Sequence, residues 1–301
     1  MSTTHPRVSA AALKDISARL HAEQVHHRIP LSVRFPNLKP FILFTRTTGT
    51  SIKHALNRKI AKKRSSVSLP YRIHKHQSLL LRKLGTSDMR LQRNKIKNLA
   101  AAIKTIDGVV IQPGEIFSLW SLVGKPTKRK GYVNGMLLSR GKVIEGLGGG
   151  LCQLANLLHW IFLHGPVEIT ERYHHSMDVF PDSGRTIPFG SGATILYNFV
   201  DLKARNVSTS PIQIRLWMTD DKLYGDLRTT DPTLDGYRVT ETDACFVLWH
   251  KKWYRYNQLW RVSKEKNKKR VSELALTNLA PVLYKVDEEI LKENGSAIVR
   301  L

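Results

Sequence analysis

Three consecutive glycines, Gly148, Gly149 and Gly150, stand directly before a cysteine and a long apolar run. Apolar residues in this run recur at the spacing of one helix face, at Leu151, Ala155, Leu158 and Phe162. Because glycine is a poor helix residue, the helix should begin after the glycines and place Cys152 at its N-terminal end. The chain must therefore bury a helix whose first turn carries a thiol.

Two interpretations of Cys152 follow. The free N–H groups and the dipole at a helix N-terminus favour a thiolate, which should lower the pKa of the thiol and make it a nucleophile. Gly148, Gly149 and Gly150 would then form a loop whose N–H groups stabilise an oxyanion, and Gln153 would orient the substrate. In the alternative, a glycine turn feeds a buried helix, Cys152 is a small core residue and Gln153 is merely exposed.

The rest of the pattern predicts an α+β fold, with helices followed by a largely antiparallel β-sheet and a catalytic-type cysteine at a helix N-terminus. Helices are expected at 11–25, 51–64, 79–84, 91–106 and 151–163. Strands are expected at 109–111, 167–173, 193–200, 212–218 and 223–227, with two or three more between 237 and 261. Prolines interrupt residues 1–70, so this segment should pack poorly against the main domain.

Composition excludes several classes of protein. The chain has 301 residues and only two cysteines, Cys152 and Cys245, too few for a disulfide scaffold or a four-thiolate zinc site. No run of 18 apolar residues and no apolar signal-peptide core occurs in it. We therefore expect a protein that is cytoplasmic or peripheral to the membrane.

The net charge of +24 is unevenly distributed. Residues 1–95 contain 20 Lys and Arg against three acidic residues, and residues 251–270 contain nine against one. Such segments attract anionic partners, which include nucleic acid, anionic lipid headgroups and acidic wall polymers. The alternative is a solvated basic surface that only keeps the protein soluble.

A nucleophilic cysteine usually works with a histidine base that a third polar group orients. His174 and His175 follow the strand at 167–173, and alternation along an extended chain should turn only one of them toward Cys152. For the third group, four candidates remain open: Asp178, Asp182, Asn198 and Asp201. No further His or Cys lies nearby at ligand spacing, so we expect neither a metal nor a cofactor.

Several motifs in order resemble the VanW family, which is named for an accessory protein of vancomycin-resistance clusters. They are Pro113-Gly114-Glu115-Ile116-Phe117-Ser118, Gly124-Lys125-Pro126-Thr127, Gly131-Tyr132, the run from Gly148 to Gln153, Glu171-Arg172 with His175-Ser176, and Asp201-Leu202-Lys203 with Asn206. The resemblance implies a basic N-terminal extension at 1–73, a VanW domain at 74–230 and a β-rich C-terminal extension at 231–301.

Some wall-associated VanW domains resemble cysteine L,D-transpeptidases, which cross-link peptidoglycan stem peptides through a thioester. The resemblance maps the family's cysteine to Cys152 and its histidine to His175. Two positions depart from the common pattern. Ala155 replaces a frequent Ser or Thr, and Gly192 replaces the Asp of an Asp-Ala-Thr run.

Two functions are consistent with these features. In the first, the protein is a cysteine acyltransferase acting on peptidoglycan-type peptides, with Cys152 as nucleophile and His175 as base and then acid. The candidates for orienting the base or holding a substrate carboxylate are Ser176, Asp182, Arg185, Asp201 and Arg172. In the second, the protein is a non-catalytic binder of a wall precursor, a partner protein or an anionic surface, using the basic N-terminal arm and residues 251–270.

Overall fold

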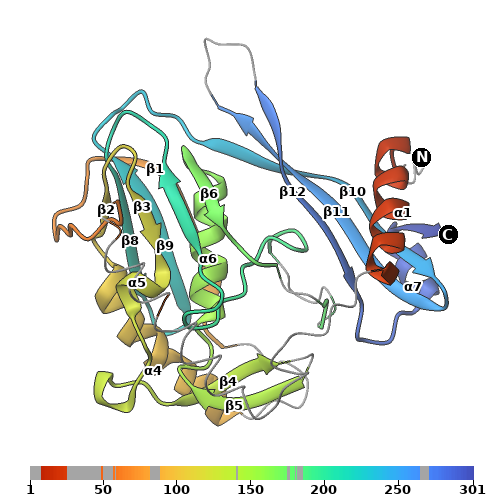
Figure 1. Cartoon of the computed structure of the whole chain (residues 1–301), viewed down its shortest axis with the longest axis horizontal. Coiled ribbons are helices and arrows are strands. Elements are labelled where there is room, and N and C mark those ends of the chain that lie inside the picture. Colours follow the sequence, from red (N-terminus) through yellow and green to blue (C-terminus); the bar gives the residue numbers. More distant parts are fainter. Residues whose placement is uncertain are drawn as a thin grey trace.

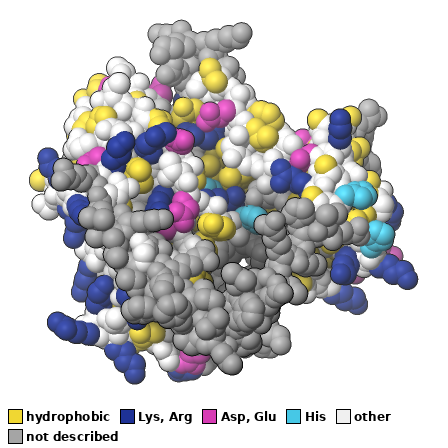
Figure 2. Space-filling model, viewed as in Figure 1, with side chains coloured by type: hydrophobic (Ala, Val, Ile, Leu, Met, Phe, Trp, Pro, Cys, Tyr) yellow, Lys and Arg dark blue, Asp and Glu magenta, His cyan; other side chains and the backbone are white. Residues whose placement is uncertain are grey.

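The computed structural model describes residues 8–25, 49, 57, 59–81, 89–139, 142–174, 177–179, 181, 186–264 and 271–301. They form two neighbouring assemblies of helices and mostly antiparallel strands (Figure 1), which confirms the predicted α+β class. Lys and Arg side chains are spread along the left edge of the face in Figure 2. None of the described helices combines the length and the apolar character that a membrane span requires.

A four-stranded antiparallel sheet, in the order β1-β9-β8-β2, is the base of the first assembly. Its strands are β1 (Tyr71–Leu79), β2 (Val110–Ile111), β8 (Ile212–Met218) and β9 (Lys222–Thr229). β8 and β9 form the hairpin that alternation and the Asp220-Asp221 turn predict, and they pair from Ile212 opposite Thr229 to Met218 opposite Leu223. The apolar side chains of this sheet form one wall of the main core.

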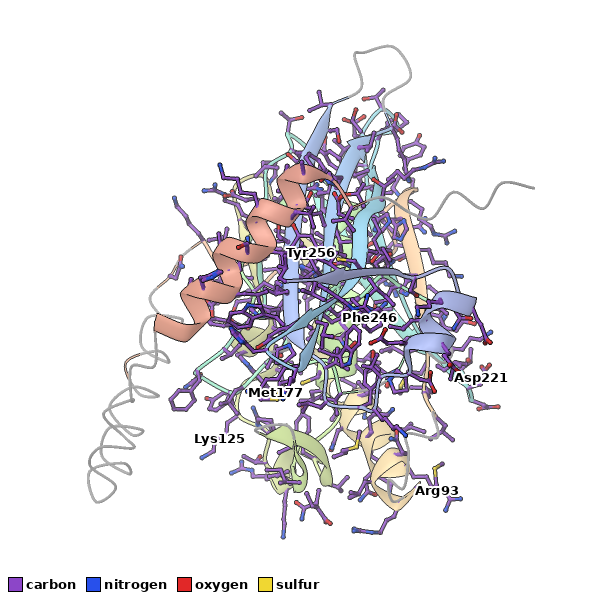
Figure 3. The ribbon with its side chains drawn as sticks, turned by 90° about the vertical axis from the view of Figure 1, so that its right-hand side faces the viewer. Arg93, Lys125, Met177, Asp221, Phe246 and Tyr256 are labelled. Carbon is purple, nitrogen blue, oxygen red and sulfur yellow. The ribbon has the colours of Figure 1, made fainter. Side chains whose placement is uncertain are left out.

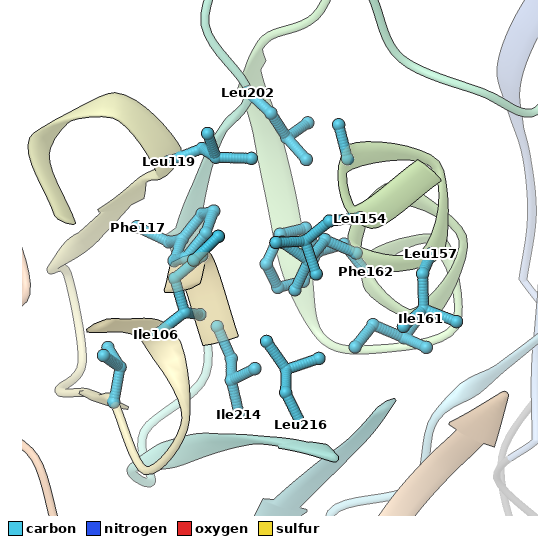
Figure 4. Close-up of a cluster of buried hydrophobic side chains, with 14 of the residues drawn as sticks. Ile106, Phe117, Leu119, Leu154, Leu157, Ile161, Phe162, Leu202, Ile214 and Leu216 are labelled. Carbon is cyan, nitrogen blue, oxygen red and sulfur yellow. The ribbon is translucent and has the colours of Figure 1, made fainter. Parts of the chain in front are cut away.

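Helices α4 (Met89–Ile106) and α6 (Cys152–Leu163) pack against that wall, as their 3.6-residue periodicity predicts. A smaller antiparallel sheet encloses the core from the other side; its strands, in the order β3-β7-β6, are β3 (Ile116–Ser118), β7 (Lys203–Asn206) and β6 (Val167–Glu171). Figure 4 shows Ile214 and Leu216 on one side of this core and Phe117 and Leu202 on the other. α6 is therefore buried along most of its length.

Between α4 and α6 the chain forms small elements that position the glycines. Helix α5 (Leu119–Val123) and the 3₁₀ helix η2 (Lys128–Lys130) come first. The hairpin of β4 (Asn134–Ser139) and β5 (Lys142–Leu147) follows, with β4 packed on α4. β5 ends one residue before the glycine turn, so the hairpin delivers that turn to the start of α6.

The second assembly is a sheet in the order β12-β11-β10-β13, in which only β13 is parallel to its neighbour. Its elements are β10 (Tyr237–Trp249), β11 (Lys252–Ser263), β12 (Ser272–Pro281), α7 (Glu288–Glu293) and β13 (Ala297–Arg300). β10 and β11 confirm the strands predicted between 237 and 261. The loop within 265–270 lies outside the described residues.

Helix α1 (Ala10–Val25) covers this second sheet. The prediction concerned packing of residues 1–70 against the main domain, and it did not include a contact of α1 with the C-terminal extension. Ala12, Ile16 and Leu20 recur every fourth residue and are each 0% exposed. They pack on Val247, Tyr256 and their neighbours, and Figure 3 shows Tyr256 beside α1. The Tyr256 hydroxyl donates to Asp15 at 3.0 Å. This apolar stripe is narrow. It packs on an apolar face of the second sheet, which the sequence of α1 alone does not predict.

Residues 59–64 also belong to the folded structure. Ile60 bridges Ile116 beside β3, and Arg64 bridges Val109 beside β2. The helix expected at 51–64 is therefore absent from 59–64, while residues 51–56 lie outside the described residues. The helix expected at 79–84 is also wrong where it can be examined, because Leu79 ends strand β1 and pairs with Lys222. The strand expected at 193–200 is reduced to isolated bridges.

Backbone carbonyls at the end of α6 connect the two assemblies. Tyr237 N donates to the His164 carbonyl at 2.9 Å. The Arg261 guanidinium donates to the carbonyls of Gly165 at 2.5 Å and Val167 at 3.2 Å. Because Arg261 is 9% exposed, these bonds are shielded from water and fix β11 against the first assembly.

Candidate functional site

Cys152 is the first residue of α6 and is partly exposed, whereas Cys245 in β10 is buried; both thiols are free. The position at the helix start is the one that the glycines predict. Backbone groups of Ile195 and of Cys152 itself hydrogen-bond to the sulfur and lower the pKa of the thiol. Both effects favour the thiolate.

Burial nevertheless raises the pKa of the Cys152 thiol above its ordinary value, because desolvation outweighs these two hydrogen bonds. The expectation of a lowered pKa is therefore wrong for the described surroundings. It considered the helix N-terminus and neglected the cost of removing a thiolate from water.

Alkylation of Cys152 should accordingly be slow at neutral pH and accelerate only above about 8.5, the usual free-thiol pKa. We expect this result from the pH dependence of iodoacetamide labelling, followed by intact mass in a Cys245→Ala background. A midpoint near pH 6–7 would contradict the raised pKa of Cys152 and would indicate an ion pair with a histidine.

A segment that we call the strap, residues 190–195, runs along α6 toward Cys152. The Ser191 carbonyl bonds to His159 Nδ1 at 2.7 Å, and Ala193 N donates to Asn156 Oδ1 at 2.8 Å. Asn156 and His159 follow Cys152 at helical spacing, so the three lie on one face of α6. The strap reaches the sulfur with Ile195.

The strap is held on its other side by the chain after β6. Thr194 N donates to the Tyr173 carbonyl at 2.8 Å, and Thr194 Oγ1 donates to the His174 carbonyl at 3.3 Å. The Arg172 guanidinium donates to the carbonyls of Gly190 and Gly192. Arg172, a predicted substrate-binding residue, thus serves to anchor the strap.

Close packing accounts for the three glycines. A Cβ at Gly149 would lie 2.2 Å from the carbonyl carbon of Gly135, and a Cβ at Gly150 would lie 2.2 Å from Lys95 Cγ. Gly148 has a φ of +76° and packs on Pro126. Asn98 Nδ2 donates to the Gly149 carbonyl at 2.8 Å, so α4 fixes the turn directly. The predicted oxyanion role of these glycines stays a prediction.

Other predicted residues have structural partners. Gln153 Nε2 donates to Ser78 Oγ at 2.9 Å and to the Leu79 carbonyl at 2.7 Å, which ties α6 to β1. The buried Asp201 accepts from Ser118 Oγ at 2.6 Å and from Trp120 N at 3.0 Å. Burial raises the pKa of Asp201, and these bonds oppose the rise.

The remaining candidates divide into two groups. Asp178 lies at the second sheet, where it accepts from the Tyr284 hydroxyl at 3.1 Å and pairs with Arg255 at 3.5 Å. Asn198 is buried in a turn with a φ of +57°. Four predicted residues lie outside the described residues: His175, Ser176, Asp182 and Arg185. Within the described ranges, no group of three or more His, Cys, Asp or Glu is placed to hold a metal ion.

Known proteins are similar to this chain over the region around Cys152. The family model described as VanW like protein matches residues 94–228. The Vancomycin B-type resistance protein VanW of Enterococcus faecalis (strain ATCC 700802 / V583) is 32% identical over 225 residues, which cover 74% of this chain and 82% of that protein. The chain belongs to the VanW family.

A second relative matches a shorter stretch. Uncharacterized protein YoaR of Bacillus subtilis (strain 168) is 32% identical over 123 residues, which cover 41% of this chain and 39% of that protein. No solved structure matches the chain. The part that the VanW model matches includes the glycine turn, α6 and the strap, whereas α1 and the second sheet lie outside it.

Sequence reasoning missed the polar residues that organise this VanW site. Asn98, Asn156 and His159 each hold a backbone segment, and Asn98 and His159 are 0% exposed. A polar residue on the apolar face of a predicted helix could have indicated these contacts. Such a residue is expected to be buried, and a buried amide or imidazole must find a hydrogen-bonding partner.

His159 should make the protein less stable in acid. Burial, and secondly the charge of Arg172, lower its pKa to about 3, while the bond to Ser191 opposes this. Since the unfolded state has a pKa near the ordinary 6.5, it binds a proton first as the pH falls. The contribution of neutral His159 to the free energy of unfolding is thus complete above about pH 6.5 and is lost toward pH 3. Near pH 4.5 the free energy of unfolding is lower by about 2–3 kcal/mol.

The variant His159→Asn tests this prediction. Asparagine keeps an N–H donor for the Ser191 carbonyl but does not titrate, so urea unfolding should depend less steeply on pH between 4.5 and 7. His250→Asn, at an exposed turn position, is the control. An unchanged slope in His159→Asn would contradict the assignment.

Proposed function

We propose that the protein is a cysteine acyltransferase that acts on peptides of the cell envelope, with Cys152 as its nucleophile. The observation that carries the proposal is the setting of the Cys152 sulfur. It lies at the start of α6 and is partly accessible, and the backbone groups of Ile195 and of Cys152 itself oppose the rise that burial causes in its pKa. N–H groups converging on a nucleophile are also placed to stabilise an oxyanion that forms beside it.

The raised pKa of Cys152 requires a base at the moment of reaction. We assign this role to His175, which follows directly after the segment that Thr194 holds beside the strap. His175 takes the thiol proton while the sulfur attacks a peptide carbonyl carbon. The C–N bond then breaks, the leaving amine takes the proton from His175, and a thioester remains. A second amine attacks that thioester, restores the thiol and forms a new amide.

The proposed donor is a peptidoglycan-type stem peptide. The relative from Enterococcus faecalis is named for vancomycin resistance. Some wall-associated VanW domains resemble cysteine L,D-transpeptidases. From the name of this relative and from the transpeptidase resemblance, we propose that this chain has a role in peptidoglycan metabolism and glycopeptide resistance.

Intact mass spectrometry after incubation with a mixture of muropeptides tests the proposal. We expect a covalent adduct that hydroxylamine removes, as it removes a thioester, and that is absent from Cys152→Ala. Cys245→Ala is the matched control, because it removes the other free thiol and should still form the adduct. If neither the wild type nor Cys245→Ala forms an adduct, the acyltransferase proposal fails.

A second proposal concerns the basic surface. Lys59, Lys62, Lys63 and Arg64 are exposed on a segment that is fixed to the first assembly. We propose that this segment helps to bind an anionic surface, for which each Lys or Arg near the membrane contributes about 1 kcal/mol. Lys62→Glu with Lys63→Glu should weaken binding to anionic vesicles and reduce its salt dependence. The double variant Lys285→Glu with Lys292→Glu is the control, because both side chains are also exposed and lie outside this segment.

A further inference from the structure

Two buried amides of the second sheet hold the residue that precedes the strap. The Phe189 carbonyl accepts from Asn257 Nδ2 on β11 at 2.8 Å and from Asn278 Nδ2 on β12 at 3.4 Å. Asn257 and Asn278 lie opposite each other in the sheet, and Asn278 Nδ2 also donates to Asn257 Oδ1 at 2.8 Å. Asn257 Nδ2 also donates to Glu241 Oε1 at 2.5 Å. Because Asn257 is 0% and Asn278 3% exposed, these bonds are shielded from water.

Close packing fixes the beginning of the strap at the same place. Gly190 has a φ of +74°, and a Cβ there would lie 2.1 Å from Asn278 Cγ. The guanidinium carbon of Arg255 lies 5.1 Å from the centroid of the Phe189 ring. Arg255 and Asn257 are two residues apart on β11 and so share one face of the sheet. The second sheet therefore contacts both the backbone and the side chain at which the strap begins.

From this point the strap leads to Cys152 through a short, buried segment. Ser191 and Ala193 are bonded to α6, and the backbone of Ile195 contacts the Cys152 sulfur. The three strap residues are at most 8% exposed. Contacts with α6 thus recur at every second residue, so a strap released at Phe189 loses the support that keeps these contacts closed.

We propose that Asn257 and Asn278 are positioning residues through which the second sheet controls access to Cys152. Held by both amides, the strap covers the thiol and keeps Ile195 beside it. Released, it admits water and small reagents and no longer orders the site for a peptide. Both residues lie outside the part that the VanW model matches, so this control is an addition to the matched domain. The inference rests on the proposed function of Cys152 for its effect on acylation.

The variant Asn257→Leu, in a Cys245→Ala background, tests this control. Leucine has a similar size but cannot donate, so the Phe189 carbonyl keeps only the longer bond from Asn278. Labelling of Cys152 by iodoacetamide at pH 7 should become about tenfold faster, because losing one to two neutral hydrogen bonds makes local opening that much more frequent. The pH midpoint of labelling should fall toward the free-thiol value as water reaches the sulfur. Adduct formation with muropeptides should instead become slower.

Tyr256→Leu in the same background is the matched control. Tyr256 is the neighbour of Asn257 on β11, but it lies on the opposite face and packs with α1. The variant should lower the unfolding temperature, because it removes a buried ring, and should leave both the labelling rate and its pH midpoint unchanged. Asn278→Ala is a second, milder test if Asn257→Leu does not fold, and it should accelerate labelling by about threefold, as expected for the loss of the longer bond.

The outcomes distinguish this inference from the acyltransferase proposal. If the folded Asn257 and Asn278 variants are labelled at the wild-type rate, or if Tyr256→Leu is labelled as fast as they are, control by the second sheet is overturned even where muropeptide adducts form. If labelling accelerates only in the two asparagine variants but no muropeptide forms an adduct on the wild type, control of access stands and the acyltransferase proposal fails.

Discussion

Replacing His175 with alanine should slow the acylation of Cys152 by about 10²–10⁴-fold, the usual contribution of a general base. The reason is the raised pKa of the Cys152 thiol, which leaves little thiolate available at neutral pH. The measurement is the rate of adduct formation with muropeptides by intact mass, in a single turnover.

His174→Ala is the matched control. Its carbonyl is held by Thr194, a backbone contact that alanine retains, and its exposed side chain has no assigned role. It should therefore react at close to the wild-type rate. A large loss in His174→Ala with little change in His175→Ala would reverse the assignment of the base.

Gly149→Ala should destabilise the protein by about 3 kcal/mol or more, at the upper end of what overpacking costs. The added Cβ would meet the backbone of Gly135 at 2.2 Å, and backbone atoms of the β4 strand cannot rotate away as a flexible side chain can. Urea unfolding should show this as a lower midpoint at an unchanged slope.

Gly114→Ala is the comparison for this effect. Gly114 has a φ of +78° but nothing within 4 Å of a Cβ, so alanine there should cost only about 1–2 kcal/mol of backbone strain. Gly149→Ala could instead be as stable as the wild type and yet fail to form the acyl adduct on Cys152. That result would favour the predicted oxyanion role of Gly149 over a packing role.

Local periodicity predicted the elements whose burial follows from their own sequence. α4 exposes one face and buries another, and α6 and β8 are apolar runs that are buried along most of their length, as their patterns indicate. β1 was missed because the run of leucines at its end resembles a helix, while its strand character comes from pairing with β9, far along the chain. The burial of α1 was missed for the same reason, since its partner surface lies in β10 and β11.

The site was predictable in position but not in electrostatics. The glycines correctly predicted that Cys152 begins α6. The direction of its pKa shift depends on how much of the surrounding protein excludes water, which no local pattern records. Likewise, the hydrogen bonds of Gln153 and Arg172 go to segments 74 and 18–20 residues away, so their roles as anchors emerge only after folding.

The pairing of α1 with the second sheet also determines when that part of the molecule can form during synthesis. Leu20 and its neighbours leave the ribosome long before Tyr256, with more than 200 residues made in between. The first assembly, residues 59–229 apart from its links to β11, is available for folding in that interval, while the apolar stripe of α1 has nothing to cover. A ribosome that pauses before β11 would therefore present this stripe to chaperones, and α1 can dock only after translation has passed both strands of its partner.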